Sequence, residues 1–501
     1  MPAIPANRAA PIAFALGLVA ACGFAPLELW PLTLLCFAGL TLLLDEVADL
    51  RRAICLGWWF GLGHFCLGLN WIATAFTYQA AMPPWLGWVA VFLLSLYLAV
   101  FPAIATGAAW LFSRDKPVSL PFFFGATWIV NELLRASVFT GFAWNPLAAI
   151  WAPVWPIREL TAWIGTYGLS GLTILFSGLI WLALTRRKAQ LAVAALVACG
   201  VAAGLVPHPA EPDNPKAILL HVVQPNIGQD RKWDEAQSAD NYHRLTALSG
   251  KPGPRPRLLL WPEVAVPALL EQDPMARLAI ASLLGPHDEM ILGAQSVKFD
   301  AQGIPLSASN SAFGLDPYAH LFGRYDKAHL VPYGEYLPMR PFLSYLGLSR
   351  LAPGDMDFDA GPGPRDINVP GLGKVGLQIC YEMIFSGHVV DRANRPLFIF
   401  NPSNDAWFGR WGPPQHLAQA RLRATEEGLP IVRSTPTGIS AVIDADGRLL
   451  ASLPWRTPGA IERPLPPAYA PTLFARYGNI LPWLVVLFLG AIGFASRRRA
   501  S

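Results

Sequence analysis

The sequence of 501 residues contains little charge. Only 14% of its residues are Asp, Glu, Lys or Arg, whereas about a quarter of an average soluble protein is charged, and this deficit excludes an ordinary soluble globular chain. The net charge of +4 is small and the basic residues form no single stripe, which excludes a surface for nucleic acids. Because no pair of Cys or His residues has the spacing of metal ligands, we expect neither a metal nor another cofactor.

Apolar residues make up 53% of the chain and are distributed unevenly. Apolar runs dominate to about residue 207, residues 216–454 mix charges and turns as in a soluble domain, and residues 481–496 are apolar again. We therefore expect transmembrane helices over residues 1–210 and an inserted soluble domain over 216–456. Residues 457–501 are expected to form a linker, a last transmembrane helix and a basic tail.

The apolar runs suggest about eight membrane spans when each is compared with the ~20 residues needed to cross a bilayer. The expected spans are residues 11–25, 30–45, 53–77, 84–112, 118–136, 164–184, 189–206 and 478–496. This count places the basic connections on one side, which is expected to be cytoplasmic. The inserted domain then lies on the opposite side of the membrane, in a periplasm-like or extracellular space. A cleavable signal peptide at residues 1–25 is the competing interpretation, and the further spans favour a retained helix.

Cysteine is scarce outside the apolar runs. Five of the 6 cysteines lie in the expected spans, where a thiol usually packs as a small apolar group: Cys22, Cys36, Cys55, Cys66 and Cys199. Cys380 alone lies in the inserted domain and has no disulfide partner there. In an oxidising compartment, a solitary thiol is either buried and inert or chemically active.

The inserted domain has the pattern of an α/β fold. Strands are expected within residues 217–227, 257–267, 290–297, 309–316, 374–380 and 396–404, a helix over 413–428, and a hairpin within 438–454 around Asp446 and Gly447. Three apolar runs end in chemically active residues, namely Glu263, Lys327 and Cys380. A thiol nucleophile needs a base that removes its proton and a cation that stabilises negative charge, which Glu and Lys supply.

Three motifs surround these residues: WPE at 261–263, YDKAHLVPYGEYLP at 325–338 and ICYE at 379–382. Their order and separations resemble the Glu, Lys, Cys signature of the carbon-nitrogen hydrolase (nitrilase) superfamily. VVQPNIGQDRKW at 222–233, NPSNDAWFG at 401–409 and the surrounding spans resemble the apolipoprotein N-acyltransferase family within it. The resemblance implies an αββα sandwich for the inserted domain.

The resemblance also implies a two-step acyl transfer. Cys380 would attack an ester of a membrane phospholipid such as phosphatidylethanolamine, forming a thioester. The α-amino group of the S-diacylglyceryl cysteine of an apolipoprotein would then take the acyl chain. Glu263 would be the general base and Lys327 the oxyanion stabiliser.

Four further positions are supporting residues by the same resemblance. Trp233 is expected to be an aromatic on the substrate side, and Glu335 a second carboxylate that steers Lys327. If the strand continues past Cys380, Glu382 lies on the same side as the sulfur and Tyr381 on the opposite side.

Three alternatives remain open. A Cys-His enzyme would use His329, His388 or His416 as its base. A membrane-bound amidase would use water as the acyl acceptor. A scaffold or transporter would use the inserted domain only for binding.

Overall fold

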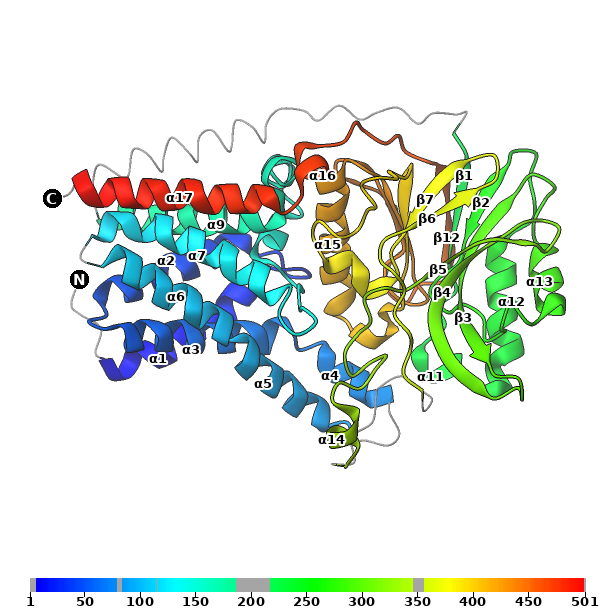
Figure 1. The fold of residues 1–501 in the computed structure, drawn as a ribbon, viewed down its shortest axis with the longest axis horizontal. Helices are drawn as coiled ribbons and strands as arrows, with labels where there is room; N and C mark the ends of the chain where they lie inside the picture. The colour runs from blue at the N-terminus through cyan, green and yellow to red at the C-terminus, as the bar shows by residue number, and fades with distance from the viewer. Residues whose placement is uncertain (1–5, 79–82, 115, 186–216, 346–355, 500–501) are drawn as a thin grey trace. The chain divides into compact units, whose positions relative to one another are not determined.

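The computed structural model describes residues 6–78, 83–114, 116–185, 217–345 and 356–499 (Figure 1). The chain divides into two compact units. The first, helical unit comprises Met1–Ala73, Trp85–Ala210 and Pro471–Ser501, and the second comprises Thr74–Pro84 and Glu211–Ala470.

The helical unit consists of apolar helices, most of them long, with short connections. They are α1 (Ala6–Ala21), α2 (Trp30–Glu46), α3 (Leu50–Gly68), α5 (Leu86–Leu98), α6 (Val100–Ser113), α7 (Leu120–Arg135), α8 (Trp155–Arg158), α9 (Thr161–Thr185), α16 (Leu473–Tyr477) and α17 (Ile480–Arg499). Glycines allow α1 and α3 to approach closely, since a Cβ on Gly17 would lie 2.0 Å from the carbonyl oxygen of Phe60 and one on Gly63 would lie 2.2 Å from that of Phe14. Such small residues are typical of helix contacts in membranes.

Helices occupy all the predicted spans except residues 189–206, which lie outside the described residues. Within the described part, three helices are long and apolar enough to cross a membrane: Leu86–Ser113, Thr161–Thr185 and Ile480–Arg497. A fourth is added if the broken pair Leu50–Gly68 and Ile72–Tyr78, which includes α4 (Ile72–Ala75), forms one span. The unit thus has the helices of a membrane protein, whereas the full count of eight spans stays a prediction.

The second unit contains two six-stranded sheets. The first has the order β12-β1-β2-β3-β4-β5, built from β12 (Gly459–Pro464), β1 (Leu219–Gln224), β2 (Arg257–Leu260), β3 (Glu289–Phe299), β4 (Pro305–Leu315) and β5 (Leu321–Asp326). The second has the order β11-β10-β9-β8-β7-β6, built from β11 (Leu449–Ser452), β10 (Ala441–Ile443), β9 (Ile431–Ser434), β8 (Phe398–Pro402), β7 (Gly373–Leu377) and β6 (Asp366–Val369).

The two sheets pack face to face, and helices cover their outer faces. Ser434 Oγ in β9 donates to the carbonyl oxygen of Val223 in β1 at 2.8 Å, which joins the sheets. Helices α12 (Ser238–Ser249) and α13 (Pro274–Ala281) lie against the first sheet, and α15 (Gly412–Glu427) lies against the second (Figure 1). The unit is therefore the αββα sandwich that the resemblance implied. Two short helices, α11 (Gln229–Lys232) and α14 (Arg340–Tyr345), complete it.

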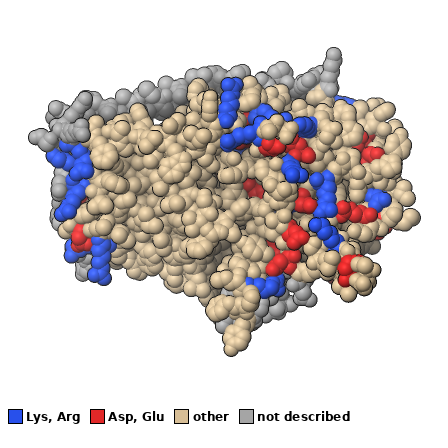
Figure 2. Space-filling model, in the orientation of Figure 1, with Lys and Arg blue, Asp and Glu red and all other residues tan. Residues whose placement is uncertain are grey.

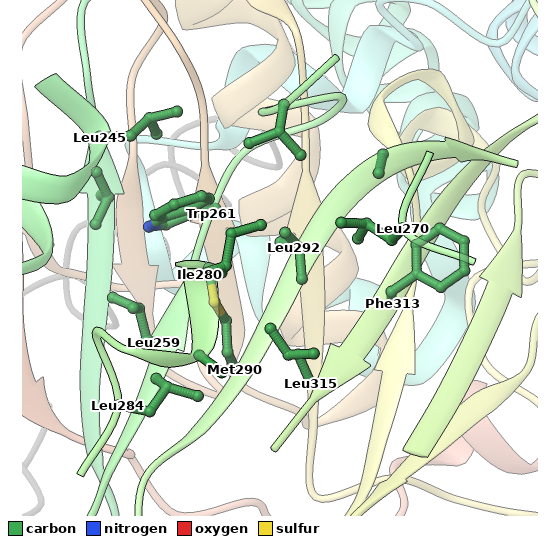
Figure 3. Packing of buried hydrophobic residues seen from close by; sticks show 14 of the residues in the cluster. Leu245, Leu259, Trp261, Leu270, Ile280, Leu284, Met290, Leu292, Phe313 and Leu315 are labelled. Carbon is green, nitrogen blue, oxygen red and sulfur yellow. The ribbon is translucent and has the colours of Figure 1, made fainter. Parts of the chain in front are cut away.

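A core of large apolar side chains fills the space between the first sheet and its helices (Figure 3). Trp261 at its centre is fully buried, and its indole Nε1 donates to Ser249 Oγ of α12 at 2.9 Å. Every residue of β2 is buried, as expected for a parallel strand covered on both faces. This packing holds the end of β2, and with it the WPE motif, in one position.

Local sequence signals hold for most elements of this unit. The hairpin of β10 and β11 forms around Asp446 and Gly447, and α15 ends at Gly428, whose φ of 63° is left-handed. The expected linker from residue 457 is wrong at its start. Residues Gly459–Pro464 instead form β12, which pairs antiparallel with β1 at the edge of the first sheet, so the domain extends beyond residue 456.

Candidate active site

The three chemically active residues follow three strand ends. Glu263 comes three residues after β2, Lys327 directly after β5, and Cys380 three residues after β7. The strands β2 and β5 belong to the first sheet and β7 to the second. Lys327 Nζ lies 3.7 Å from Glu263, and both charges act on the thiol of Cys380, so the tertiary structure brings together side chains from both sheets.

Cys380 has an unusual backbone conformation. Its φ is 51°, in the left-handed region that residues with a Cβ rarely adopt, and its side chain is buried, with 4% exposed. A 3-10 helix begins here and spans Cys380–Ile384. Such strained backbone is often found at functional sites. The turn aims the sulfur differently from a continuing strand.

Close packing fixes the backbone around Glu263. Gly293 in β3 lies against it, because a Cβ there would lie 2.5 Å from the nitrogen of Val264. The backbone N–H of Gly293 donates to Pro262, and that of Ala265 donates to the carbonyl oxygen of Gly293 at 2.8 Å. Only glycine at position 293 permits this approach.

The two oxygens of Glu263 have different surroundings. Asn310 Nδ2 donates to Oε1 at 2.6 Å. Oε2 is buried and accepts no hydrogen bond from any residue that the structure describes. A carboxylate oxygen in this state is suited to accept a proton from a nearby thiol.

Lys327 is buried between two carboxylates, with 1% of its area exposed. Its Nζ lies 2.9 Å from the carboxylate of Glu335 and 3.7 Å from Oε1 of Glu263. Burial alone would lower the pKa of Lys327, but Glu335, Glu263 and Cys380 together raise it far above its usual value. The ammonium group thus stays charged at all physiological pH values, as an oxyanion stabiliser requires.

The thiol of Cys380 is neutral at rest. Burial raises its pKa well above the usual value, and the negative charges of Glu263 and Asp405 add to this effect. Lys327 and the backbone N–H of Asn404 oppose it. A nucleophilic role for this thiol would therefore require a base close to the sulfur that takes its proton during the attack.

Glu382 does not occupy the position expected from a continuing strand. The 3-10 turn removes that geometry, and the carboxylate instead accepts four hydrogen bonds. Its donors are Tyr325 Oη at 2.8 Å and the backbone N–H groups of Ala328 at 2.7 Å, His329 at 3.0 Å and Ile379 at 2.6 Å. Glu382 thus ties the loop after Lys327 to the residue before Cys380.

Comparison with known proteins adds a family to this geometry. Residues 16–179 match the family model "Apolipoprotein N-acyltransferase N-terminal domain", and residues 219–471 match "Carbon-nitrogen hydrolase". Apolipoprotein N-acyltransferases of Bradyrhizobium diazoefficiens and Rhodopseudomonas palustris are 36% and 33% identical, each over 98% of this chain and 95% and 96% of their own lengths. The chain belongs to the apolipoprotein N-acyltransferase family. The Caulobacter vibrioides member is 35% identical over 96% of this chain and 93% of its own.

In this apolipoprotein N-acyltransferase family member, Tyr381 and Trp233 lie in different settings. Tyr381 is buried, and its ring centroid lies 5.8 Å from that of His329 and 5.4 Å from that of Phe385. This aromatic cluster begins at the residue next to Cys380. Trp233 has 40% of its area exposed and is not part of the buried cluster.

The contacts described for the three candidate histidines lie away from the sulfur. His416 contacts Cys380, but through the backbone: its Nε2 donates to the carbonyl oxygen of Cys380 at 3.0 Å. Its Nδ1 lies 3.1 Å from Asp405. His329 packs its ring 3.8 Å from that of Phe385, and His388 is exposed. None of these contacts involves the sulfur.

The sequence analysis missed two residues of the site. Asn310 donates to both Glu263 and Glu335, at 2.6 and 2.9 Å, and Lys232 Nζ donates to the backbone carbonyl of Glu263 at 3.0 Å. A signal for Asn310 existed, since an amide in the buried strand SNSAFGL needs polar partners. For Lys232, the only signal in the sequence was its position next to Trp233. Among the described residues, no three His, Cys, Asp or Glu side chains are grouped to hold a metal.

Proposed function

We propose that this chain transfers a fatty acyl chain from a membrane phospholipid to the α-amino group of the N-terminal S-diacylglyceryl cysteine of apolipoproteins. The reaction proceeds in two steps through a thioester on Cys380. The observation that carries the proposal is the buried Lys327, charged and placed between Glu263 and Glu335 beside the thiol of Cys380. The family membership supplies the substrate class.

In the first step, Glu263 removes the proton of Cys380 as the sulfur attacks the ester carbonyl. A C–S bond forms, and the carbonyl oxygen becomes an oxyanion that Lys327 stabilises. The C–O bond of the ester then breaks. The departing alkoxide takes the proton from Glu263 and leaves as a lysophospholipid.

In the second step, the neutral α-amino group attacks the thioester. Glu263 takes a proton from the nitrogen, Lys327 again stabilises the oxyanion, and the C–S bond breaks. The thiolate regains its proton from Glu263, and the product is an amide. Exclusion of water protects the thioester between the two steps.

The supporting residues have distinct roles in this scheme. Glu335 and Glu382 hold Lys327 and its loop, while Tyr381 packs beside the nucleophile. Trp233, exposed next to Lys232, is available for contact with the substrate. Phosphatidylethanolamine is the proposed acyl donor.

We place the chain in the bacterial inner membrane, with eight spans and the catalytic domain on the periplasmic side, and the apolar helices support a membrane location. Figure 2 shows Lys and Arg gathered at one end of the helical unit, while the rest of its visible flank has little charge. Arg497 at the end of α17 donates to the carbonyl oxygen of Phe112 near the end of α6, at 2.8 Å. Basic residues favour the cytoplasmic end of a span.

Mass spectrometry of the full chain tests the proposal. The protein in detergent is mixed with phosphatidylethanolamine alone, and an acyl group is expected on the peptide that contains Cys380. A diacylglyceryl peptide with a free amine should then remove this group and gain an amide. Cys380→Ala is the control without a nucleophile.

Two results would contradict the proposal. If no acyl group forms on Cys380, the donor step is wrong. If the acyl group is released as free fatty acid in the presence of the peptide, the chain is an amidase-like hydrolase with water as acceptor.

A further inference from the structure

The short helix α11 connects the two sides of the site. At its start, Gln229 Oε1 accepts a hydrogen bond from Asn404 Nδ2 at 3.0 Å, and the backbone N–H of Asn404 points to the sulfur of Cys380. At its end, Lys232 Nζ donates to the backbone carbonyl of Glu263 at 3.0 Å. One four-residue helix therefore touches both the nucleophile loop and the base loop.

The acidic side chains of the site outnumber its cations, so a second cation beside Lys327 would stabilise it. Glu263 and Glu335 are both acidic, and Lys327 alone balances only one of them. Asp405 adds a further negative charge near the sulfur, although Arg433 pairs with it at 2.5 Å. A thiolate or an oxyanion would add yet another negative charge, which is costly in a buried site unless a cation lies nearby.

Lys232 is the cation that faces this negative charge. The acidic groups that act on its ammonium are Glu263 and Cys380. On its own element, Arg231 is turned to Gln237 and Asp240, and Asp230 lies in the first turn of α11. Tyr242 of α12 lines the same largely apolar cavity of about 240 Å³ as Lys232. Burial lowers the pKa of Lys232 to about 8, while Glu263 and Cys380 oppose this change.

We propose that Lys232 is a positioning residue for acyl transfer, which fixes Glu263 through its backbone carbonyl and places a second positive charge beside the Cys380 thiolate. This inference rests on the proposed function for its role in the reaction. The effect of the Lys232 charge on the thiol of Cys380 does not depend on which acyl donor is used.

The test compares Lys232→Met, which removes the charge, with Lys232→Arg, which keeps it. The rate of iodoacetamide alkylation at Cys380 is measured at pH 7 in the full chain, by mass spectrometry of the Cys380 peptide. Lys232 carries its charge at this pH, so we expect Lys232→Met to slow alkylation by about tenfold, as for loss of an opposite charge that lowers the thiol pKa by about one unit. Lys232→Arg should keep the wild-type rate. Lys298→Met, at an exposed site in β3, is the matched control.

A second readout follows thioester formation with phosphatidylethanolamine. Lys232→Met should slow it by about tenfold, which corresponds to one pKa unit of lost charge stabilisation, and Lys232→Arg should restore most of the rate. Equal alkylation rates at pH 7 in the wild type and Lys232→Met would overturn the inference, as would slow acylation in both Lys232 variants without any change in the alkylation rate. If the wild type forms no thioester, the proposed function fails, while the alkylation rate at pH 7 still decides the role of Lys232.

Discussion

Asn310 Nδ2 lies 2.6 Å from Oε1 of Glu263 and 2.9 Å from Oε1 of Glu335, and all three side chains are buried. One amide thus bridges two carboxylates that would otherwise repel each other. The backbone carbonyl of Asn310 also accepts from the N–H of Lys327 at 2.9 Å. The proposed base, the proposed oxyanion stabiliser and its partner carboxylate are therefore all held by one residue of β4.

Asn310→Ala should slow thioester formation strongly. Hydrogen bonds to charged groups contribute about 1.5–3 kcal/mol each, so loss of the bridge predicts a fall of about 10- to 100-fold. The rate is measured with phosphatidylethanolamine by mass spectrometry. Ser307→Ala, in the same strand but outside the cluster, should keep the wild-type rate; equal rates for both variants would show that the bridge is dispensable.

Lys327→Met should abolish acylation and destabilise the fold. Removing the cation leaves Glu263 and Glu335 buried without their partner, at a cost of about 3–5 kcal/mol for a buried pair. The melting temperature and the acylation rate are the two measurements. A variant with normal activity would refute the role of Lys327 as oxyanion stabiliser.

The ionisation of Lys327 should not shape the pH profile in the working range. Its pKa in the folded chain is raised, so the stability from its charge is complete below the unfolded pKa of about 10.4. That stability is lost only as the pH rises through the higher folded value. An activity change between pH 6 and 9 that disappears in Lys327→Arg would contradict this expectation.

Glu382→Gln should lower the stability of the fold and should also make that stability less dependent on pH. Burial raises the pKa of Glu382 to about 7, against the hydrogen bonds from His329, Ile379 and Tyr325 and the charge of Lys327. Since the pKa is raised from an unfolded value of about 4.3, this group favours folding below that pH, and the contribution is lost as the pH rises to about 7. The glutamine removes this loss, so the melting temperature should vary less between pH 4.5 and 7.

Glu289→Gln is the matched control for that experiment. Burial and the charges of Asp316 and Asp288 raise the pKa of Glu289 to about 7 as well, but Glu289 lies at the start of β3, away from the site. It should also flatten the pH dependence of the melting temperature while leaving acylation unchanged. Glu382→Gln should reduce acylation, because an amide cannot accept from four donors; full activity would show that its hydrogen bonds do not position the loops.

His416→Gln discriminates between the proposed base and a Cys-His pair. Glutamine can donate to the Cys380 carbonyl as His416 Nε2 does, so we expect the acylation rate to fall by no more than about 100-fold, for the loss of one contact of Nδ1 with the charged Asp405 or Arg433. A Cys-His enzyme would lose about 10⁴-fold or more on loss of its base. A loss of that size would transfer the role of general base from Glu263 to His416.

Local patterns in the sequence determined much of this protein. Apolar runs of helical length, the helix that begins at Pro413 and ends before Gly428, and the hairpin at Asp446 are encoded by neighbouring residues, as are most strands of the second unit. The sequence analysis did not predict four of its strands, namely β5, β6, β9 and β12. The placement of Glu263, Lys327 and Cys380 after strand ends also follows from local signals. Their roles came from the resemblance to a family.

The tertiary structure alone decided which groups meet around these residues. Asn310 and Glu263 are 47 positions apart, and Tyr325 and Glu382 are 57 apart, so no local periodicity reports their contact. The left-handed turn at Cys380 redirected Glu382, and β12 joined the first sheet from beyond the expected boundary. Hydrogen bonds and charge pairs of this kind form only when distant segments are packed together, because burial makes an unpaired polar group costly and so selects its partner from whatever the fold brings near.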